Sequence, residues 1–207
     1  MHRFFGAATA IVLLALAGCS TSVTVDSDFP EPVNHSLPVR AGLLLEEDFL
    51  AYTFERDKGR DITLALGNAQ GELFRNVANH LFVSVRELEA LPQGDSGLDL
   101  VLSPRVEDIQ LATPFDTKLE VFEVWIKYNI RVYRGDGEPL ADWIMTAYGK
   151  TPTRFLKSRG EALNRATVVA LRDAGARLII EFPRVPAVYN WLKDNIREKD
   201  ASTGAGP

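Results

Sequence analysis

The chain has 207 residues, of which 46% are hydrophobic and 25% are charged, and its formal net charge at pH 7 is -5. This composition is typical of a folded globular protein and excludes an intrinsically disordered chain. The negative charge argues against a nucleic-acid partner, which requires a basic surface. Once a short leader is set aside, the remaining length fits one domain with a small appendage.

The first eighteen residues have the layout of a secretory signal peptide. His2 and Arg3 precede an apolar run of about a dozen residues that begins at Phe4. This run is shorter than the roughly 20 residues that a membrane-spanning helix needs. It ends in Leu16, Ala17, Gly18 and Cys19. The alternatives are an ordinary signal peptide with a chance cysteine and an uncleaved anchor helix.

These four residues resemble the lipobox of bacterial lipoproteins. The resemblance implies that Cys19 is lipidated and becomes the first residue of the mature chain. The processing peptidase would then read the residues before it, Leu16, Ala17 and Gly18. Ser20 stands where, in the enterobacterial sorting rule, an Asp retains a lipoprotein in the inner membrane. The resemblance therefore implies a lipid anchor in the outer membrane, on the periplasmic side.

The folded part is expected to begin after a tether. Residues 19–38 are polar and interrupted by prolines, and they hold no helical or strand period for long. Residues 39–183 are expected to form one domain. A short C-terminal helix at 184–200 and a disordered tail at 201–207 follow it.

Within this domain the hydrophobic pattern alternates between strand and helix. A buried strand is predicted at 39–45, an amphipathic helix at 67–81 and a strand at 82–88. Two extended pieces, 98–103 and 106–111, are separated by Pro104, which suggests a sheet edge or a bulge. A second long helix is predicted at 159–182, and Pro183 and Pro186 end it.

Residues 119–133 give the clearest strand signal. Apolar residues alternate there with polar ones such as Glu123, Lys127 and Arg131, and a glycine-containing turn leads into a hairpin partner at 140–149. The predicted fold class is α+β. We expect a mostly antiparallel sheet with two long helices on one face, plus the short C-terminal helix.

Candidate chemistry is sparse in this sequence. One histidine in the folded region, His80, cannot begin a convincing metal site, so we expect neither a metal nor a cofactor nor a catalytic residue. Paired carboxylates on the middle strands leave an envelope hydrolase as an alternative. The carboxylates concerned are Glu107, Asp108, Asp116, Glu120 and Glu123. The basic face of the second helix, which carries Arg165, Arg172 and Arg177, is either a solvated surface or a site for an acidic headgroup or partner.

Two tryptophans are candidate contact residues. Trp125 falls on the polar face of the best strand, and Trp143 belongs to its hairpin partner. A large aromatic ring on a polar face suggests a partner surface. The alternative is that the terminal helix covers Trp125 through Trp191.

The order of elements over residues 39–182 is similar to that of small outer-membrane lipoproteins of the YajG and LptE type and of the auxiliary lipoproteins of ABC transport systems. This resemblance implies a non-catalytic binding or assembly accessory of the cell envelope, whose ligand is a lipid, a glycan or a protein. The alternatives are the envelope hydrolase and a structural subunit of an envelope complex.

Replacement of the lipidated residue tests the anchor. We expect Cys19→Ser to leave an unprocessed precursor, because the peptidase acts on the lipidated cysteine. The measurement is the mass of the membrane-bound protein and its partition into detergent. A variant that is still cleaved and still sediments with the outer membrane would show that the lipobox interpretation is wrong.

Overall fold

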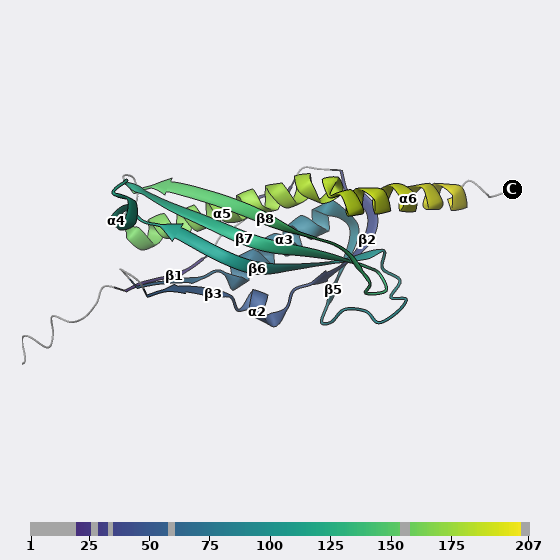
Figure 1. Ribbon diagram of the computed structural model, residues 1–207, viewed down its shortest axis with the longest axis horizontal. Helices are drawn as coiled ribbons and strands as arrows, with labels where there is room; N and C mark the ends of the chain where they lie inside the picture. Colours follow the sequence, from purple (N-terminus) through teal and green to yellow (C-terminus); the bar gives the residue numbers. More distant parts are fainter. Residues whose placement is uncertain (1–19, 26–28, 33–34, 58–60, 154–157, 204–207) are drawn as a thin grey trace, which may run out of the picture.

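The structure, a computed structural model, describes residues 20–25, 29–32, 35–57, 61–153 and 158–203. It confirms the α+β class (Figure 1). Its strands are β1 (Thr21–Thr24), β2 (Leu37–Leu44), β3 (Thr53–Arg56), β4 (Ile62–Ala65), β5 (Phe82–Leu88), β6 (Leu100–Ala112), β7 (Val121–Arg134) and β8 (Pro139–Pro152). Its helices are α2 (Glu47–Leu50), α3 (Gly67–Leu81), α4 (Pro114–Thr117), α5 (Arg159–Glu181) and α6 (Pro186–Thr203), with a 3-10 turn at Phe182–Arg184.

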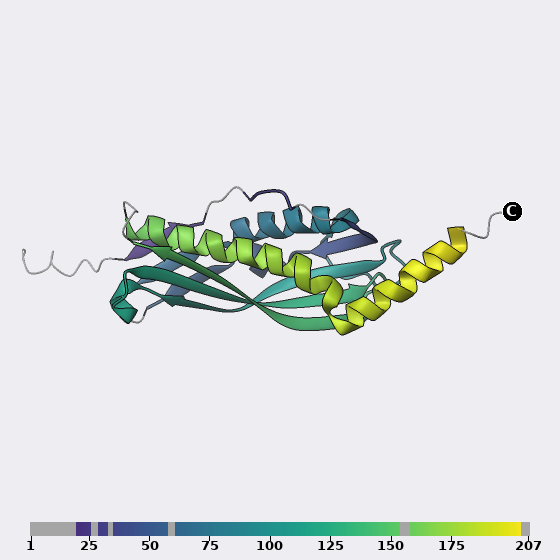
Figure 2. The ribbon, with the colours of Figure 1, turned by 90° about the horizontal axis from the view of Figure 1, so that it is seen from above.

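The larger of two sheets has five strands in the order β5-β2-β6-β7-β8. Figure 2 shows α3 and α5 side by side over one face of it. Helix α3 contacts β2 and β5, helix α5 contacts β7 and β8, and the two helices contact each other. The predicted arrangement of two long helices on one face is therefore present.

Strand β7 has the predicted alternation. Its inward residues are all buried against the helices: Phe122, Val124, Ile126, Tyr128, Ile130 and Val132. Tyr128 is fully buried, and its hydroxyl donates a hydrogen bond of 3.1 Å to the amide oxygen of Gln70 on α3. The Gln70 amide in turn donates to the Phe49 carbonyl at 2.6 Å. One buried polar chain thus joins β7, α3 and α2.

The sheets are more mixed than the sequence suggested. Three strand pairings are parallel, β1–β4, β2–β5 and β2–β6, and three are antiparallel, β3–β4, β6–β7 and β7–β8. The two predicted pieces around Pro104 form one continuous strand, β6. Pro104 is tolerated because the pairing of β2 with β6 ends at Leu102. At Pro104, β6 therefore pairs with β7 alone among the described strands, and its other edge needs no amide hydrogen.

Part of the predicted tether belongs to the fold. Residues 21–24 form β1, which pairs in parallel with β4 in a second sheet of order β1-β4-β3. Val23, Val25 and Phe29 are buried in the main core, and the Phe29 carbonyl accepts a hydrogen bond from Asn76 of α3. The expectation of a free tether is therefore wrong for these residues.

The C-terminal helix is longer than expected. Helix α6 has 18 residues and runs to Thr203, so it includes the first residues of the predicted tail. Val188, Trp191 and Leu192 on its first turns are buried in the core. Helix α6 extends from the end of the molecule opposite to α4 (Figures 1 and 2).

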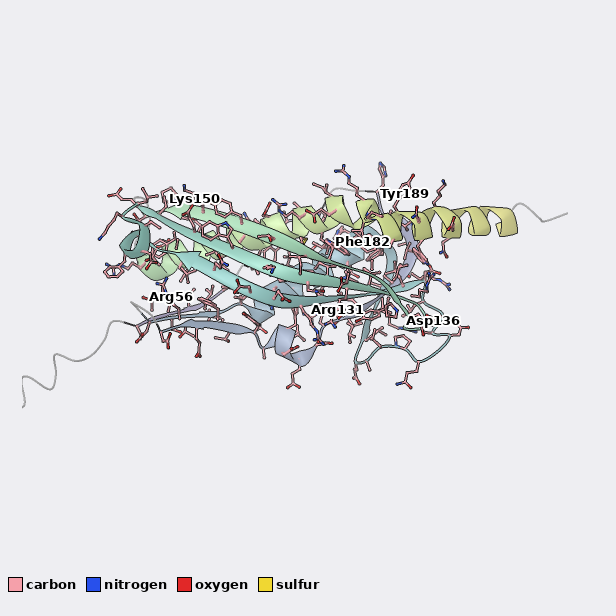
Figure 3. All side chains as sticks on the ribbon, viewed as in Figure 1. Arg56, Arg131, Asp136, Lys150, Phe182 and Tyr189 are labelled. Carbon is pink, nitrogen blue, oxygen red and sulfur yellow. The ribbon has the colours of Figure 1, made fainter. Side chains whose placement is uncertain are left out.

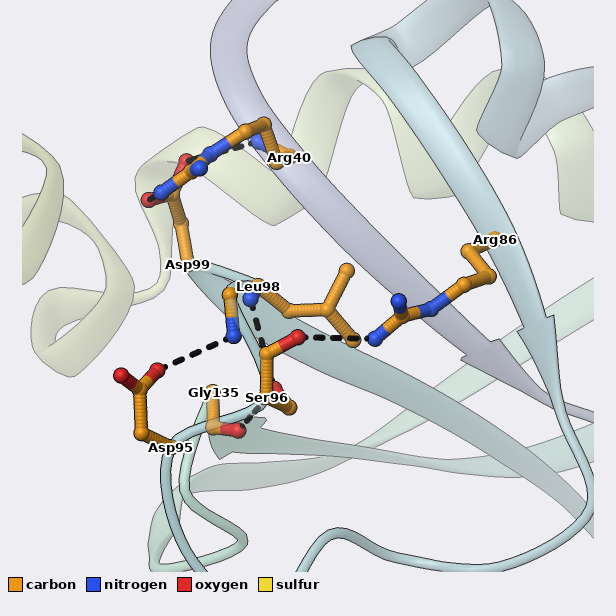
Figure 4. A network of polar contacts seen from close by, with 8 residues as sticks. Arg40, Arg86, Asp95, Ser96, Leu98, Asp99 and Gly135 are labelled. Atoms are coloured by element: carbon orange, nitrogen blue, oxygen red, sulfur yellow. Dashed lines mark hydrogen bonds and ion pairs between the residues drawn. The ribbon is translucent and has the colours of Figure 1, made fainter.

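The same end as α6 holds the connection between β5 and β6, which a polar network fixes (Figure 4). Asp99 accepts hydrogen bonds from the Arg40 backbone amide at 2.7 Å and from its guanidinium at 3.0 Å. Arg86 donates to the Ser96 carbonyl at 2.9 Å, and the Ser96 hydroxyl donates to the Gly135 carbonyl. The connection is thereby tied to β2, β5 and the β7–β8 turn.

Helix α5 lies unusually close to β8. Its sheet-facing residues are small, with Ala166 and Ala170 fully buried. A Cβ placed on Gly149 of β8 would collide with the Ala166 carbonyl and with the backbone of Ala170. Because backbone atoms form the obstacle, no side-chain rotation relieves the contact. Gly149 is therefore required by the helix–sheet distance.

This contact gives a stability prediction. We expect Gly149→Ala to lower the free energy of unfolding by about 1–3 kcal/mol or more, because the added methyl overpacks the interface. The matched control is Gly160→Ala in the first turn of α5, where a Cβ would make only ordinary contact with Val23. There the substitution should stabilise by up to about 1 kcal/mol. Denaturant midpoints measure both, and equal effects of the same sign would contradict the interpretation.

Candidate functional site

The main candidate site is a cleft of about 440 Å³ at the end of the molecule that holds α4, called here the N-terminal cleft. It lies where the small sheet, α4, the start of β7 and the start of α5 meet. Its described lining is Thr21, Arg56, Ile62, Thr113, Pro114, Phe115, Glu120, Phe122, Thr153, Arg159 and Leu163. The volume falls within the roughly 300–1,000 Å³ typical of small-ligand pockets.

The lining combines apolar walls with a few charges. Ile62, Phe122 and Leu163 are buried core residues that contribute apolar surface. Phe115 on α4 is 57% exposed, and Leu119, which follows α4, is 56% exposed. An apolar pocket whose opening also carries exposed apolar side chains suits a ligand that is itself largely apolar.

Arg56, the last residue of β3, is the least exposed cation of this cleft. Figure 3 places it between the small sheet and the larger one. Its side chain is 17% exposed, and Nη1 donates to Asp116 Oδ2 at 2.9 Å and to the Leu111 carbonyl at 3.5 Å. Nε and Nη2 are buried and have no hydrogen-bond partner among the described residues. Arg56 therefore has one paired edge and one unpaired edge.

Asp116 is held in place by the capping box of α4. Its Oδ2 also accepts hydrogen bonds from the Thr113 backbone amide at 2.9 Å and from the Thr113 hydroxyl at 2.8 Å. Burial raises the pKa of Asp116, but the hydrogen bonds from Thr113 and Arg56 outweigh it, so the pKa is lowered overall. The carboxylate form is thus favoured, and Asp116 is a fixed anion that orients Arg56.

The predicted lipidation and processing residues, Leu16, Ala17, Gly18 and Cys19, lie outside the described residues. The described chain starts at Ser20, and Thr21 lines the N-terminal cleft. Two extended residues span about 7 Å. Cys19 precedes Thr21 by two positions in the sequence.

Trp125 lies on the face of the sheet opposite to the helices. Its ring packs on Tyr148 of β8, with ring centroids 5.2 Å apart. The Tyr148 hydroxyl donates to Glu123 Oε1 at 2.6 Å, and this bond raises the pKa of Tyr148 to about 12. A small hollow of about 210 Å³ beside Trp125 is lined also by Asp108, Gln110, Lys127 and Thr146. This surface stays a predicted contact site.

Trp143 lies on the other face. It is half-buried against the core, and its ring centroid is 6.4 Å from that of Phe182 at the end of α5. Trp191 also belongs to the core cluster. The sequence left open that α6 covers Trp125 through Trp191. Among the described residues, the ring that packs on Trp125 is instead that of Tyr148.

The candidate carboxylates are divided between two places. Asp116 and Glu120 lie at the N-terminal cleft, whereas Glu123 and Asp108 lie on the Trp125 face. Glu123 is occupied by Tyr148 and by Lys150, whose Nζ is 3.7 Å from Oε1. Glu107 is exposed at the register shift in β6. The structure thus does not bring these five acids together.

Sequence comparison finds no matching family model and no matching curated protein. The fold is similar to that of solved structures. One is a protein from Xanthomonas campestris described with the family model DUF330, at 11% identity and a TM-score of 0.50, covering 78% of this chain and 91% of that one. Another is a minor lipoprotein from Acinetobacter baumannii, at 10% identity and a TM-score of 0.44, covering 70% and 91%. The Xanthomonas similarity shows a shared fold.

The separation of the two tryptophans gives a testable prediction. Trp191→Ala should cost about 3–5 kcal/mol by emptying a core site, and Trp125→Ala should cost about 0.5–1.5 kcal/mol by removing the ring pair with Tyr148. Because different residues surround the two rings, the loss of unfolding free energy in the double variant should equal the sum of the two single losses within about 0.5 kcal/mol. Denaturant unfolding measures the cycle. A coupling well above that margin would mean that α6 does cover Trp125.

Proposed function

We propose that this protein is a lipid-anchored, non-catalytic accessory of the bacterial outer membrane that binds a lipid in the N-terminal cleft. The observation that carries this proposal is the position of the cleft: Thr21, in its lining, follows the predicted lipidated residue Cys19 by two positions. A lipid on Cys19 would hold the opening within about 10 Å of the bilayer surface.

The chemistry of the walls supports the same ligand class. Binding removes the apolar surface of a lipid chain from water only where the protein wall is also apolar. The free energy gained is about 25 cal/mol for each Å² of apolar surface that is buried. Ile62, Phe122 and Leu163 offer it inside the cleft, and Phe115 offers it at the opening. The fold shared with the Xanthomonas protein is compatible with this role but is not evidence for it.

Within the described residues no helix is long and apolar enough to cross a membrane. In this proposal Cys19 provides the membrane attachment. One lipid chain anchors a protein only marginally, and stable attachment needs a second chain or another membrane contact. Phe115 and Leu119 are placed to add such a contact.

Native mass spectrometry of the full-length lipoprotein, released from detergent micelles, tests the proposal. We expect a non-covalent adduct of one lipid per chain, distinct in mass from the covalent lipid on Cys19. Phe115→Ser should lower the adduct fraction several-fold because it removes apolar surface at the opening. The matched control is Tyr189→Ser on α6, an aromatic residue of similar exposure, 55% against 57%, at the opposite end of the molecule. Absence of the adduct, or equal loss in both variants, would contradict lipid binding in this cleft.

A further inference from the structure

We propose that the N-terminal cleft is selective for an amphiphile with an anionic headgroup, whose oxyanion binds the unpaired edge of Arg56. This inference rests on the proposed function and adds the chemical class of the ligand. The shared chemistry is a carboxylate or phosphate group that can accept two parallel N–H donors.

The geometry of Arg56 supports this selectivity. Nε and Nη2 lie on the same edge of the guanidinium plane, and this is the edge that forms two parallel hydrogen bonds with a carboxylate or phosphate. These are the two nitrogens without a partner among the described residues. Nη1, on the other edge, is the one that binds Asp116.

Buried hydrogen-bond donors without an acceptor are unfavourable, and most proteins avoid them. Arg56 lines the cleft and has two such donors, Nε and Nη2, which indicates a ligand that supplies the acceptors. Because both atoms are buried, a small rotation of the Arg56 side chain must accompany binding. Asp116 limits that rotation by holding Nη1, and Thr113 holds Asp116.

The start of α5 adds positive potential on the other side of the cleft. Arg159 is the first residue of this 23-residue helix, it is exposed, and it lines the cleft. The amino end of a helix carries a partial positive charge. Among the acids here, Asp116 is committed to Arg56 and Thr113, and Glu120 also lines the cleft. An anion is therefore expected to bind near Arg56 and Arg159, away from Glu120.

The experiment compares amphiphiles that share one oleoyl chain and differ in headgroup: oleate, oleoyl lysophosphatidic acid and uncharged monoolein. Each pair is added in equal amounts to the full-length lipoprotein in a non-ionic detergent, and native mass spectrometry gives the adduct ratio. We expect at least about a tenfold preference for an anionic amphiphile over monoolein. The ratio of oleate to lysophosphatidic acid then tells a carboxylate ligand from a phosphate ligand, and competition by inorganic phosphate tells a headgroup from a free anion.

Arg56→Lys is the decisive variant because it keeps the charge beside Asp116 and removes the bidentate edge. The anionic preference should fall to about threefold or less, with binding of monoolein unchanged. Arg105→Lys is the matched control and should keep the preference, because Arg105 is paired with Glu46 and does not belong to the described lining of the cleft. Equal binding of monoolein and anionic amphiphiles, or a preference that survives Arg56→Lys, would overturn the headgroup site alone. Failure of every amphiphile to bind would instead overturn the proposed function.

Discussion

The close contact between α5 and β8 fixes the positions of both ends of this molecule. Gly149 lets the backbone of α5 approach the sheet to a distance that any side chain at that position would prevent. The alanines of α5 complete the contact, since they bury little side chain and lose little conformational entropy. Because the helix cannot shift on the sheet, its first residue Arg159 is held at the N-terminal cleft. Its end is likewise held where Phe182 packs on Phe82 and Trp143.

The N-terminal segment depends on that same helix. Strand β1 contacts α5, and Val23 within this strand is buried in the core. Farther along, Phe29 enters the core beside α3. A chain that joins the fold this early leaves only Ser20 between Cys19 and the folded protein. The anchor predicted at Cys19 would then act as a short attachment that restricts orientation, in contrast to the long tether that the sequence suggested.

The sequence predicts elements whose signal is local. Strand β7 and helices α3 and α5 each hold one period long enough to identify them, and Ala166 and Ala170 already indicate close packing on a sheet. Strand β1 could not be found in this way, because four residues carry almost no period and its partner β4 is about forty residues away. The candidate site is harder still. Arg56 and Asp116 are 60 residues apart, and each alone looks like an ordinary surface charge.

The two ends of the molecule therefore differ in what they can contact. If Cys19 carries the proposed lipid, the N-terminal cleft, Phe115 and Leu119 would face the membrane, whereas α6 extends from the opposite end (Figure 1). Tyr189 on α6 is exposed at that distal end, and Trp125 packs on Tyr148 on the face of the sheet away from the helices. A lipid ligand and a protein partner would then reach separate surfaces. Loss of one contact need not disturb the other, because the fixed helix α5 lies between them.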